Sequence, residues 1–262
     1  MIPDESITTS ATADTEPAAT PSANSVSPCS KRRVEDFDVV AFDADDTLWV
    51  SEDTFQRTEA RFAELIDPYA PEGIDVLDAL HATERDDVPI QGYGVKAFTI
   101  SMVRAAVRMT DGAVPSSVIG EIVDMGQQML IEPVHLLPGV AETLHRVGLE
   151  VRLALITKGD LVHQLRKVET SGLAHHFADV EVVREKDPEV YRRIMQRMGV
   201  PADRFLMVGN SVKSDVLPVV AIGGHAVHVP YHLTWELEQV DEHDEDVVEL
   251  DSISELPNWL GL

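Results

Sequence analysis

The stretch FDADDTLW places three carboxylates within four positions of the chain, on Asp43, Asp45 and Asp46. Like charges this close are unfavourable unless a cation, hydrogen bonds or water screen them. A carboxylate can attack phosphorus and form an aspartyl-phosphate, and a second one two residues further on can protonate the leaving group. The spacing indicates a nucleophile with a proton carrier beside it, whereas an acidic turn without chemistry is the alternative interpretation.

Polar side chains also stand at the ends of three later apolar runs, and each has a chemical use beside such a nucleophile. Carboxylates supply the hard oxygen ligands that suit Mg²⁺, while a lysine and a hydroxyl can hold phosphoryl oxygens. Open parallel sheets bind ligands outside the carboxyl ends of their strands, so we expect these groups to meet at one edge. They are Thr157 and Lys158 at the end of residues 151–157, Lys186 after 178–183, and Asn210 and Asp215 after 204–209.

Apolar runs and helical segments alternate from Phe37 onward, and this order predicts a doubly wound, Rossmann-like α/β fold with a parallel sheet. Several runs are rich in Val, Leu, Ile and Phe without strict alternation, as in strands that are buried on both faces. The expected strands cover 37–42, 151–157, 178–183, 204–209, 225–230 and 246–251, and the expected helices cover 139–147, 160–172, 187–199 and 212–224.

The interval between the first two strands has apolar residues at helical spacing, for example Phe98, Met102 and Ala105, and no convincing strand. This pattern predicts about four helices inserted after the first strand. We therefore expect three parts of the chain. They are a tail at 1–33 that its composition predicts to be disordered, an α/β core domain at 34–50 and 135–262, and a helical domain at 51–134.

The formal net charge of −25 argues against nucleic acid and anionic membrane surfaces as partners. The single cysteine, Cys29, excludes an intrachain disulfide and fits a reducing compartment. The N-terminus lacks the basic and apolar regions of a secretory signal, so we expect a cytoplasmic protein. The ten histidines show no metal-ligand spacing, and His163 and His228 are interpreted as surface or helix-end residues.

In these motifs the chain resembles the haloacid dehalogenase-like hydrolases. FDADDTLW is similar to the first motif of that family, DxDxT, and FLMVGNSVKSDV is similar to its acidic fourth motif. Thr157 in LALITKGD matches the second motif, and Lys186 in REKDPEVYRR matches the third. All four motifs occur in the order of the family between residues of about 37 and 230. The inserted helices lie where the C1-type cap domain of the family lies.

The resemblance implies a role for each of the matching residues. Asp43 would be the nucleophile and a ligand of Mg²⁺. Asp45 would be the general acid and base, and its backbone carbonyl would also bind Mg²⁺. Asp215 would complete the protein ligands of the metal, and Thr157 and Lys186 would bind phosphate.

Two positions depart from the pattern of the family. Asp46 stands where many members have Gly, so it is interpreted as a turn residue, because Asp tolerates unusual backbone conformations. Asn210 stands where many members have Asp, which leaves its part in metal binding open. Lys158, beside Thr157, is a further residue that we expect to support the site.

Within the family, the dehalogenase branch has no acid two residues after the nucleophile, whereas a phosphatase needs one for the leaving alkoxide. Asp45 therefore favours a Mg²⁺-dependent phosphomonoester hydrolase whose substrate is a small phosphorylated metabolite. The alternatives are a 2-haloacid dehalogenase or a phosphomutase on the same scaffold, or a phospho-accepting binding module without hydrolysis.

Overall fold

The computed structural model of the protein describes residues 32–240 and 247–262. The prediction of a disordered tail falls almost entirely on residues 1–31, which lie outside the described residues, as does Cys29. The acidic stretch 241–246 lies outside them as well.

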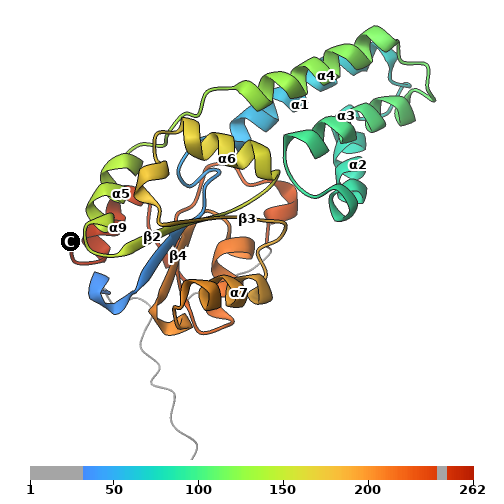
Figure 1. The fold of residues 1–262 in the computed structure, drawn as a ribbon. Coiled ribbons are helices and arrows are strands. Elements are labelled where there is room, and N and C mark those ends of the chain that lie inside the picture. Colours follow the sequence, from blue (N-terminus) through green and yellow to red (C-terminus); the bar gives the residue numbers. More distant parts are fainter. Residues whose placement is uncertain (1–31, 241–246) are drawn as a thin grey trace, which may run out of the picture.

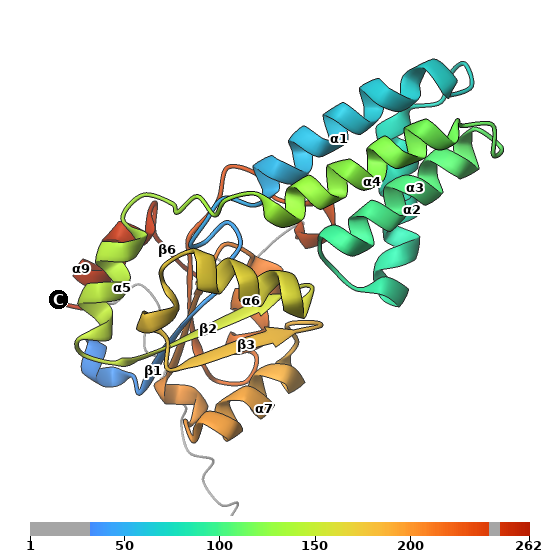
Figure 2. The same ribbon diagram turned by 45° about the horizontal axis from the view of Figure 1, so that its top comes forward.

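A six-stranded parallel sheet with the strand order β3-β2-β1-β4-β5-β6 forms the centre of the core (Figures 1 and 2). The chain enters the sheet in its interior and then builds outward on both sides, which confirms the predicted doubly wound fold. In the register, Phe42 at the end of β1 pairs with Leu155 of β2 and Val208 of β4. The strands are β1 (Val39–Phe42), β2 (Arg152–Lys158), β3 (Asp179–Val183), β4 (Phe205–Gly209), β5 (His225–His228) and β6 (Val248–Glu249).

Helices follow the strands where the sequence predicts them. Asp187 caps the helix that begins at Pro188, because its side chain accepts a hydrogen bond from the backbone of Val190 at 2.7 Å. Pro218 delays the start of another helix, which a π-helical turn at Val212–Val216 precedes. The core helices are α5 (Val140–Gly148), α6 (Leu161–Thr170), α7 (Pro188–Met198), α8 (Leu217–Val220) and α9 (Leu256–Trp259).

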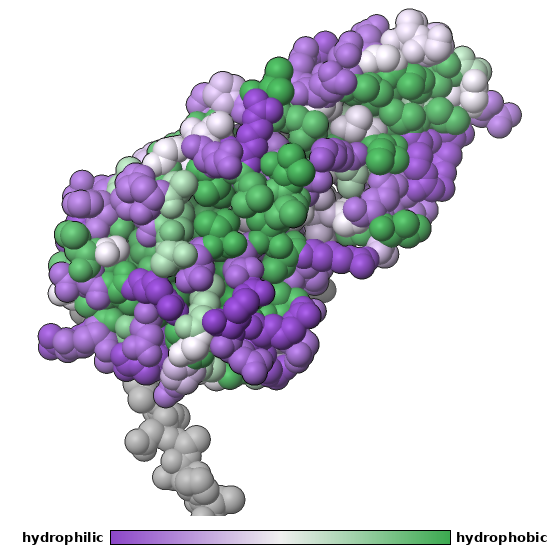
Figure 3. Space-filling view, in the orientation of Figure 1, coloured by the Kyte–Doolittle hydropathy of each residue, from purple (hydrophilic) through white to green (hydrophobic). Residues whose placement is uncertain are grey.

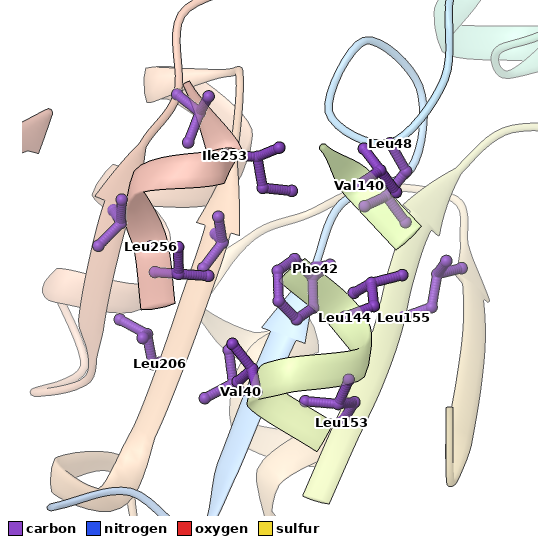
Figure 4. Packing of buried hydrophobic residues seen from close by; sticks show 14 of the residues in the cluster. Val40, Phe42, Leu48, Val140, Leu144, Leu153, Leu155, Leu206, Ile253 and Leu256 are labelled. Atoms are coloured by element: carbon purple, nitrogen blue, oxygen red, sulfur yellow. The ribbon is translucent and has the colours of Figure 1, made fainter. Parts of the chain in front are cut away.

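Both faces of the sheet are buried, because side chains alternate across a strand. Val40 and Phe42 pack on one face with residues of α5 and α9, as Figure 4 shows. Val39 and Ala41 pack on the other face with residues of α7. This double burial explains why the sequence shows continuous apolar runs where an exposed sheet would show alternation.

The first four α-helices after β1 form a helical module with its own apolar core, at one end of the molecule (Figures 1 and 2). Two connections that lie side by side link it to the sheet, and Trp49 of the first is bridged to Leu136 of the second. Among the described residues, no helix is both long and apolar enough to cross a bilayer. The helices of the module are α1 (Glu52–Ile66), α2 (Val76–Gln91), α3 (Val95–Met109) and α4 (Ser116–Ile131).

Candidate active site

One cavity of about 1230 Å³, part of it open to solvent, lies between the carboxyl ends of the strands and helices α1, α2 and α3. Every residue that the sequence singles out as a site candidate lines it. The parallel register brings these residues together, because Phe42, the last residue of β1, pairs with Leu155 and Val208 near the ends of β2 and β4. The candidates are Asp43, Asp45, Asp46, Thr157, Lys158, Lys186, Asn210 and Asp215.

Lys186 joins two of the carboxylates at the bottom of this cavity. Its ammonium contacts Oδ1 of Asp43 and lies 2.6 Å from Oδ1 of Asp215, and all three side chains are buried. Burial raises the pKa of Asp43 to about 7; the Lys186 charge opposes this shift, and the Asp215 charge adds to it. Burial alone would lower the pKa of Lys186, but the two carboxylates raise it, so the lysine is charged.

The position of Asp215 depends on the π-helical turn and on a glycine. The backbone N–H of Ser211 donates to Oδ2 of Asp215 at 3.0 Å. A Cβ atom at Gly209 would lie 2.2 Å from that same oxygen, far inside van der Waals contact. Gly209 therefore has a steric role in placing Asp215.

Asn210 and Thr47 approach the other oxygen of Asp43. The amide of Asn210 fits with its nitrogen toward the site, where it donates to Oδ2 of Asp43 at 3.2 Å and to the carbonyl of Asp45 at 3.2 Å. The hydroxyl of Thr47 lies 3.4 Å from Oδ2 of Asp43. In this orientation Asn210 acts as a donor that holds Asp43.

Three donors hold the Asp45 carboxylate. Trp49 Nε1 donates to it at 2.6 Å, Gln164 Nε2 donates at 2.8 Å, and the Lys167 ammonium forms an ion pair with it. Burial would raise the pKa of Asp45, but the charge and hydrogen bond of Lys167 and the other donors lower it below its usual value. Asp45 is therefore ionised in this arrangement. Sequence reasoning missed Gln164 and Lys167, although their spacing puts them on one face of α6.

Asp46 has a backbone φ of 61°, in the left-handed region that favours Gly. Its side chain accepts hydrogen bonds from the backbone of Ser51 at 2.8 Å and of Glu52 at 3.1 Å, at the start of α1. Burial, followed by the charge of Asp45, raises its pKa to about 8. These contacts fit the interpretation of Asp46 as a turn residue.

Thr157 and Lys158 lie at the end of β2. Thr157 is buried, and its hydroxyl donates to the Lys158 carbonyl at 3.3 Å. The Lys158 ammonium is 2.5 Å from Oε1 of Glu238 and 3.3 Å from Oε1 of Glu185, and it lies 4.4 Å from the centroid of the Tyr93 ring. Sequence reasoning missed Glu238, which belongs to the 3₁₀ turn Glu236–Glu238 after β5.

The comparisons with known proteins agree with these motifs. The profile of the haloacid dehalogenase-like hydrolases matches residues 37–223, which is more than half of the chain. The chain belongs to this family. A haloacid dehalogenase-like family hydrolase from Xanthomonas campestris is 39% identical, with a TM-score of 0.76 over 85% of this chain and 90% of that one.

Two further similarities are weaker evidence about this hydrolase. A glyceraldehyde 3-phosphate phosphatase from Methanothermobacter thermautotrophicus is 33% identical over 42% of this chain. The match spans about half of that relative, 51% of its length. A 2-haloacid dehalogenase from Pseudomonas syringae shares the fold at 21% identity, with a TM-score of 0.59 over 86% of this chain and 98% of that one.

The donor set of the hydrolase fits Mg²⁺. Two buried carboxylates, Asp43 and Asp215, share one ammonium, so the group carries excess negative charge that a cation would offset. The Asp45 carbonyl adds a third oxygen close by, within reach of the same Asn210 amide that contacts Asp43.

Histidines lie closer to the site than the sequence indicates. His163 lies at a helix end as expected, in the first turn of α6, and it also lines the cavity. The interpretation of His228 as a surface or helix-end residue was wrong, because it ends β5 and is 8% exposed. His228 contacts Glu249 at 2.9 Å and the Asn210 carbonyl at 3.1 Å. Burial, followed by the charge of Lys167, lowers the pKa of His163 to about 4, so its ring is neutral.

Proposed function

We propose that this hydrolase is a Mg²⁺-dependent phosphatase that cleaves the phosphoric monoester of a small metabolite. The observation that carries the proposal is the pair Asp43 and Asp45, which line one cavity together with Lys186 and Thr157. The relative named as a glyceraldehyde 3-phosphate phosphatase supports a phosphate ester as the substrate.

In the first step, Lys186 and Thr157 hold the phosphoryl oxygens while a carboxylate oxygen of Asp43 attacks phosphorus. The ester P–O bond breaks, and Asp45 gives its proton to the departing alkoxide oxygen. Lys167 keeps Asp45 ionised without substrate, but an approaching phosphate dianion raises the pKa of a neighbouring carboxyl and favours the protonated form.

In the second step, Asp45 takes a proton from a water molecule whose oxygen attacks the phosphorus of the aspartyl-phosphate. The acyl phosphate P–O bond breaks, which frees Asp43 and releases inorganic phosphate. Asp43, Asp215 and the Asp45 carbonyl would hold Mg²⁺. When bound, Mg²⁺ neutralises charge on the transferring phosphoryl group.

We also propose that residues 51–134 act as a cap of the C1 type over the core domain at 34–50 and 135–262. Contacts between the two parts surround the cavity: Lys96 pairs with Asp160 at 3.0 Å, and Tyr93 donates to Glu185 at 2.7 Å. A lid of this kind excludes water and selects small substrates by fit.

The test is a screen of small phosphate esters with Mg²⁺ and with EDTA, on the full chain and on Asp43→Asn. We expect Mg²⁺-dependent release of phosphate that falls by about 10⁴-fold or more in Asp43→Asn. Asp124→Asn, on the exposed side of α4, is the matched control and should retain activity. Phosphatase activity that survives Asp43→Asn would refute the mechanism. Halide release from a 2-haloacid in EDTA would identify a dehalogenase.

A further inference from the structure

Far more carboxyl groups than basic groups line the cavity. Two lysines line it, Lys158 and Lys186, and His163 is neutral. Among the described residues, ten carboxylates line it as well. They are Asp43, Asp45, Asp46, Glu52, Glu59, Glu84, Asp87, Asp160, Asp215 and Glu238. The strand ends account for the phosphate site, so the acids on the helical module need a separate explanation.

One corner of the cavity shows how this protein binds an ammonium group. The Lys158 Nζ lies between the carboxylates of Glu238 and Glu185 and above the face of the Tyr93 ring. Trp235 packs against that ring, with 5.8 Å between the centroids. Carboxylates together with an aromatic face are a favourable environment for an alkyl ammonium.

A second corner has the same ingredients on α1, α2 and α3. The carboxylates of Glu52, Glu59 and Glu84, which we call the glutamate wall, line the cavity together with Phe55 and Phe98. The rings of Phe55 and Phe98 pack edge to face, with 5.1 Å between their centroids. A ligand in the cavity therefore meets carboxylates and aromatic rings on this side too.

The glutamate wall lacks the lysine that the first corner has. Glu84 is 7% exposed, its Oε2 has no hydrogen-bond partner among the described residues, and it forms no ion pair with any of them. The neighbouring Arg85 pairs with Glu236 instead, at 2.7 Å. Burial, followed by the charges of Glu59 and Glu52, raises the pKa of Glu84 to about 8. A buried carboxyl of this kind is costly to ionise without a partner, and a cation bound beside it would favour its charged form.

We propose that the substrate is the phosphate ester of an amino alcohol and that the glutamate wall binds its cationic nitrogen. This inference rests on the proposed phosphatase function. The phosphoryl group binds at the strand ends, and the leaving group extends toward α1 and α2. There Glu84 and Glu59 offset its positive charge while Phe55 and Phe98 contact its alkyl groups.

A divalent metal ion is the competing occupant, because ligand atoms of Glu59, His81 and Glu84 lie within 4.8 Å of one another. The lining of the cavity favours the organic cation. His81 does not line the cavity, whereas apolar and aromatic side chains from α1, α2 and α3 do: Phe55, Val88, Val95, Ala97 and Phe98. Apolar side chains supply no ligands to a hard cation, but they suit the alkyl part of an ammonium group.

The test compares esters that differ in charge and match in shape. Choline phosphate is paired with neohexyl phosphate, in which carbon replaces nitrogen. ω-Aminoalkyl phosphates of increasing length are paired with alkyl phosphates that carry a methyl group in place of the ammonium. We expect the best cationic ester to exceed its neutral partner in kcat/KM by about 10- to 100-fold, mostly through KM.

The variant Glu84→Gln keeps the shape and removes the charge. We expect it to lower the preference for the cationic ester by about tenfold. The preference is a ratio, so it does not depend on the amount of folded enzyme, and Glu59→Gln is a second variant with the same expected direction. Glu64→Gln, exposed on α1, is the control that should keep the preference. Equal turnover of cationic and neutral esters, or a preference that both cavity variants keep, overturns the inference and leaves the phosphatase proposal intact.

If no ester is hydrolysed, the phosphatase proposal fails, and calorimetry then decides the inference alone. Binding of choline that is weaker for neohexanol and lost in Glu84→Gln supports the cation site, and no binding of choline overturns it. Titration with Mn²⁺ tests the competing occupant. A second bound equivalent that both His81→Ala and Glu84→Gln abolish would make the glutamate wall a metal site and overturn the inference.

Discussion

The strand ends and the glutamate wall line the same cavity, but their buried carboxyl groups differ in whether a cationic side chain pairs with them. At the strand ends three carboxylates are paired with lysines: Asp43 and Asp215 share Lys186, and Asp45 binds Lys167. On the wall, Glu84 is buried without an ion pair to any residue in the described ranges. Pairing fixes the position of the strand-end carboxylates, whereas the unpaired buried carboxyl of Glu84 remains available to a ligand.

The largest expected effect tests the paired side of this comparison. Lys186→Met leaves Asp43 and Asp215 buried without their ammonium. We expect a loss of about 3–5 kcal/mol in the free energy of unfolding and of about 10³-fold in turnover. Urea denaturation and steady-state kinetics measure the two. Lys96→Met breaks the half-exposed pair with Asp160 and should cost less than about 1 kcal/mol. Equal costs for the two variants would show that burial of the strand-end pair is not what distinguishes it.

The next effect tests how the Asp215 carboxylate is held in position. Gly209→Ala puts a methyl group against Asp215 Oδ2, so we expect a loss of about 1–3 kcal/mol in stability together with a fall in kcat. Gly120→Ala, on α4 with nothing near its added carbon, should instead stabilise the protein by about 0.5–1 kcal/mol. Thermal and urea unfolding of both variants check the opposite signs. An unchanged kcat in Gly209→Ala would mean that Asp215 needs no such support.

A smaller effect separates Asp46 from the aspartates that we place in the chemistry. Asp46→Ala removes the acceptor of the Ser51 and Glu52 N–H groups at the start of α1 and puts Ala in the left-handed region, so we expect it to destabilise the fold by about 2 kcal/mol. Asp46→Asn keeps an acceptor oxygen and tolerates that backbone, so its stability should stay within about 0.5 kcal/mol of the wild type. Denaturation curves measure both changes. A collapse of kcat in Asp46→Asn, without a loss of stability, would give Asp46 a chemical role.

The last effect tests the unpaired side through its pH dependence. Burial raises the pKa of Glu84 from 4.5 to about 8, so folding takes up a proton between these pH values. Its favourable contribution to stability is complete below the lower value and is lost as the pH rises through the upper one. Relative to the wild type, Glu84→Gln should therefore gain about 1 kcal/mol or more in the free energy of unfolding between about pH 5 and pH 8. Glu64→Gln is the control, and its difference from the wild type should not change with pH. A pH-independent difference for Glu84→Gln would mean that Glu84 is partnered.

The strand ends were predictable because each part of the signal is local. Buried parallel strands give apolar runs, and the polar residue after each run must lie at the edge of the sheet that binds ligands. Asp43, Thr157 and Asp215 could therefore be located from the residues before them. The unusual backbone expected at Asp46 follows from the family motif that this stretch resembles, and the structure has a positive φ there.

The glutamate wall was not predictable because nothing local encodes it. Glu59 lies on α1, whereas His81 and Glu84 lie on α2, and the packing of the two helices brings them together. The partners of Asp45 are equally remote, since Lys167 is 122 positions further along the chain. The sequence also does not indicate that apolar residues of α6 are exposed. Leu161, Val162 and Leu165 form an apolar surface there (Figure 3).

The contacts of Trp49 restrict where the helical module can be exchanged for that of another protein. Its indole is fully buried and donates to Asp45, and its backbone pairs with Leu136 on the return connection from the helical module. The neighbouring bonds, from Val50 to His135 and from Leu137 to Leu48, join the two connections into a short ribbon. A chimaera that carries a foreign set of helices must therefore be spliced beyond this ribbon, on the side of the module. A junction at Trp49 itself would transplant the helices of the module and at the same time remove a hydrogen-bond donor to Asp45.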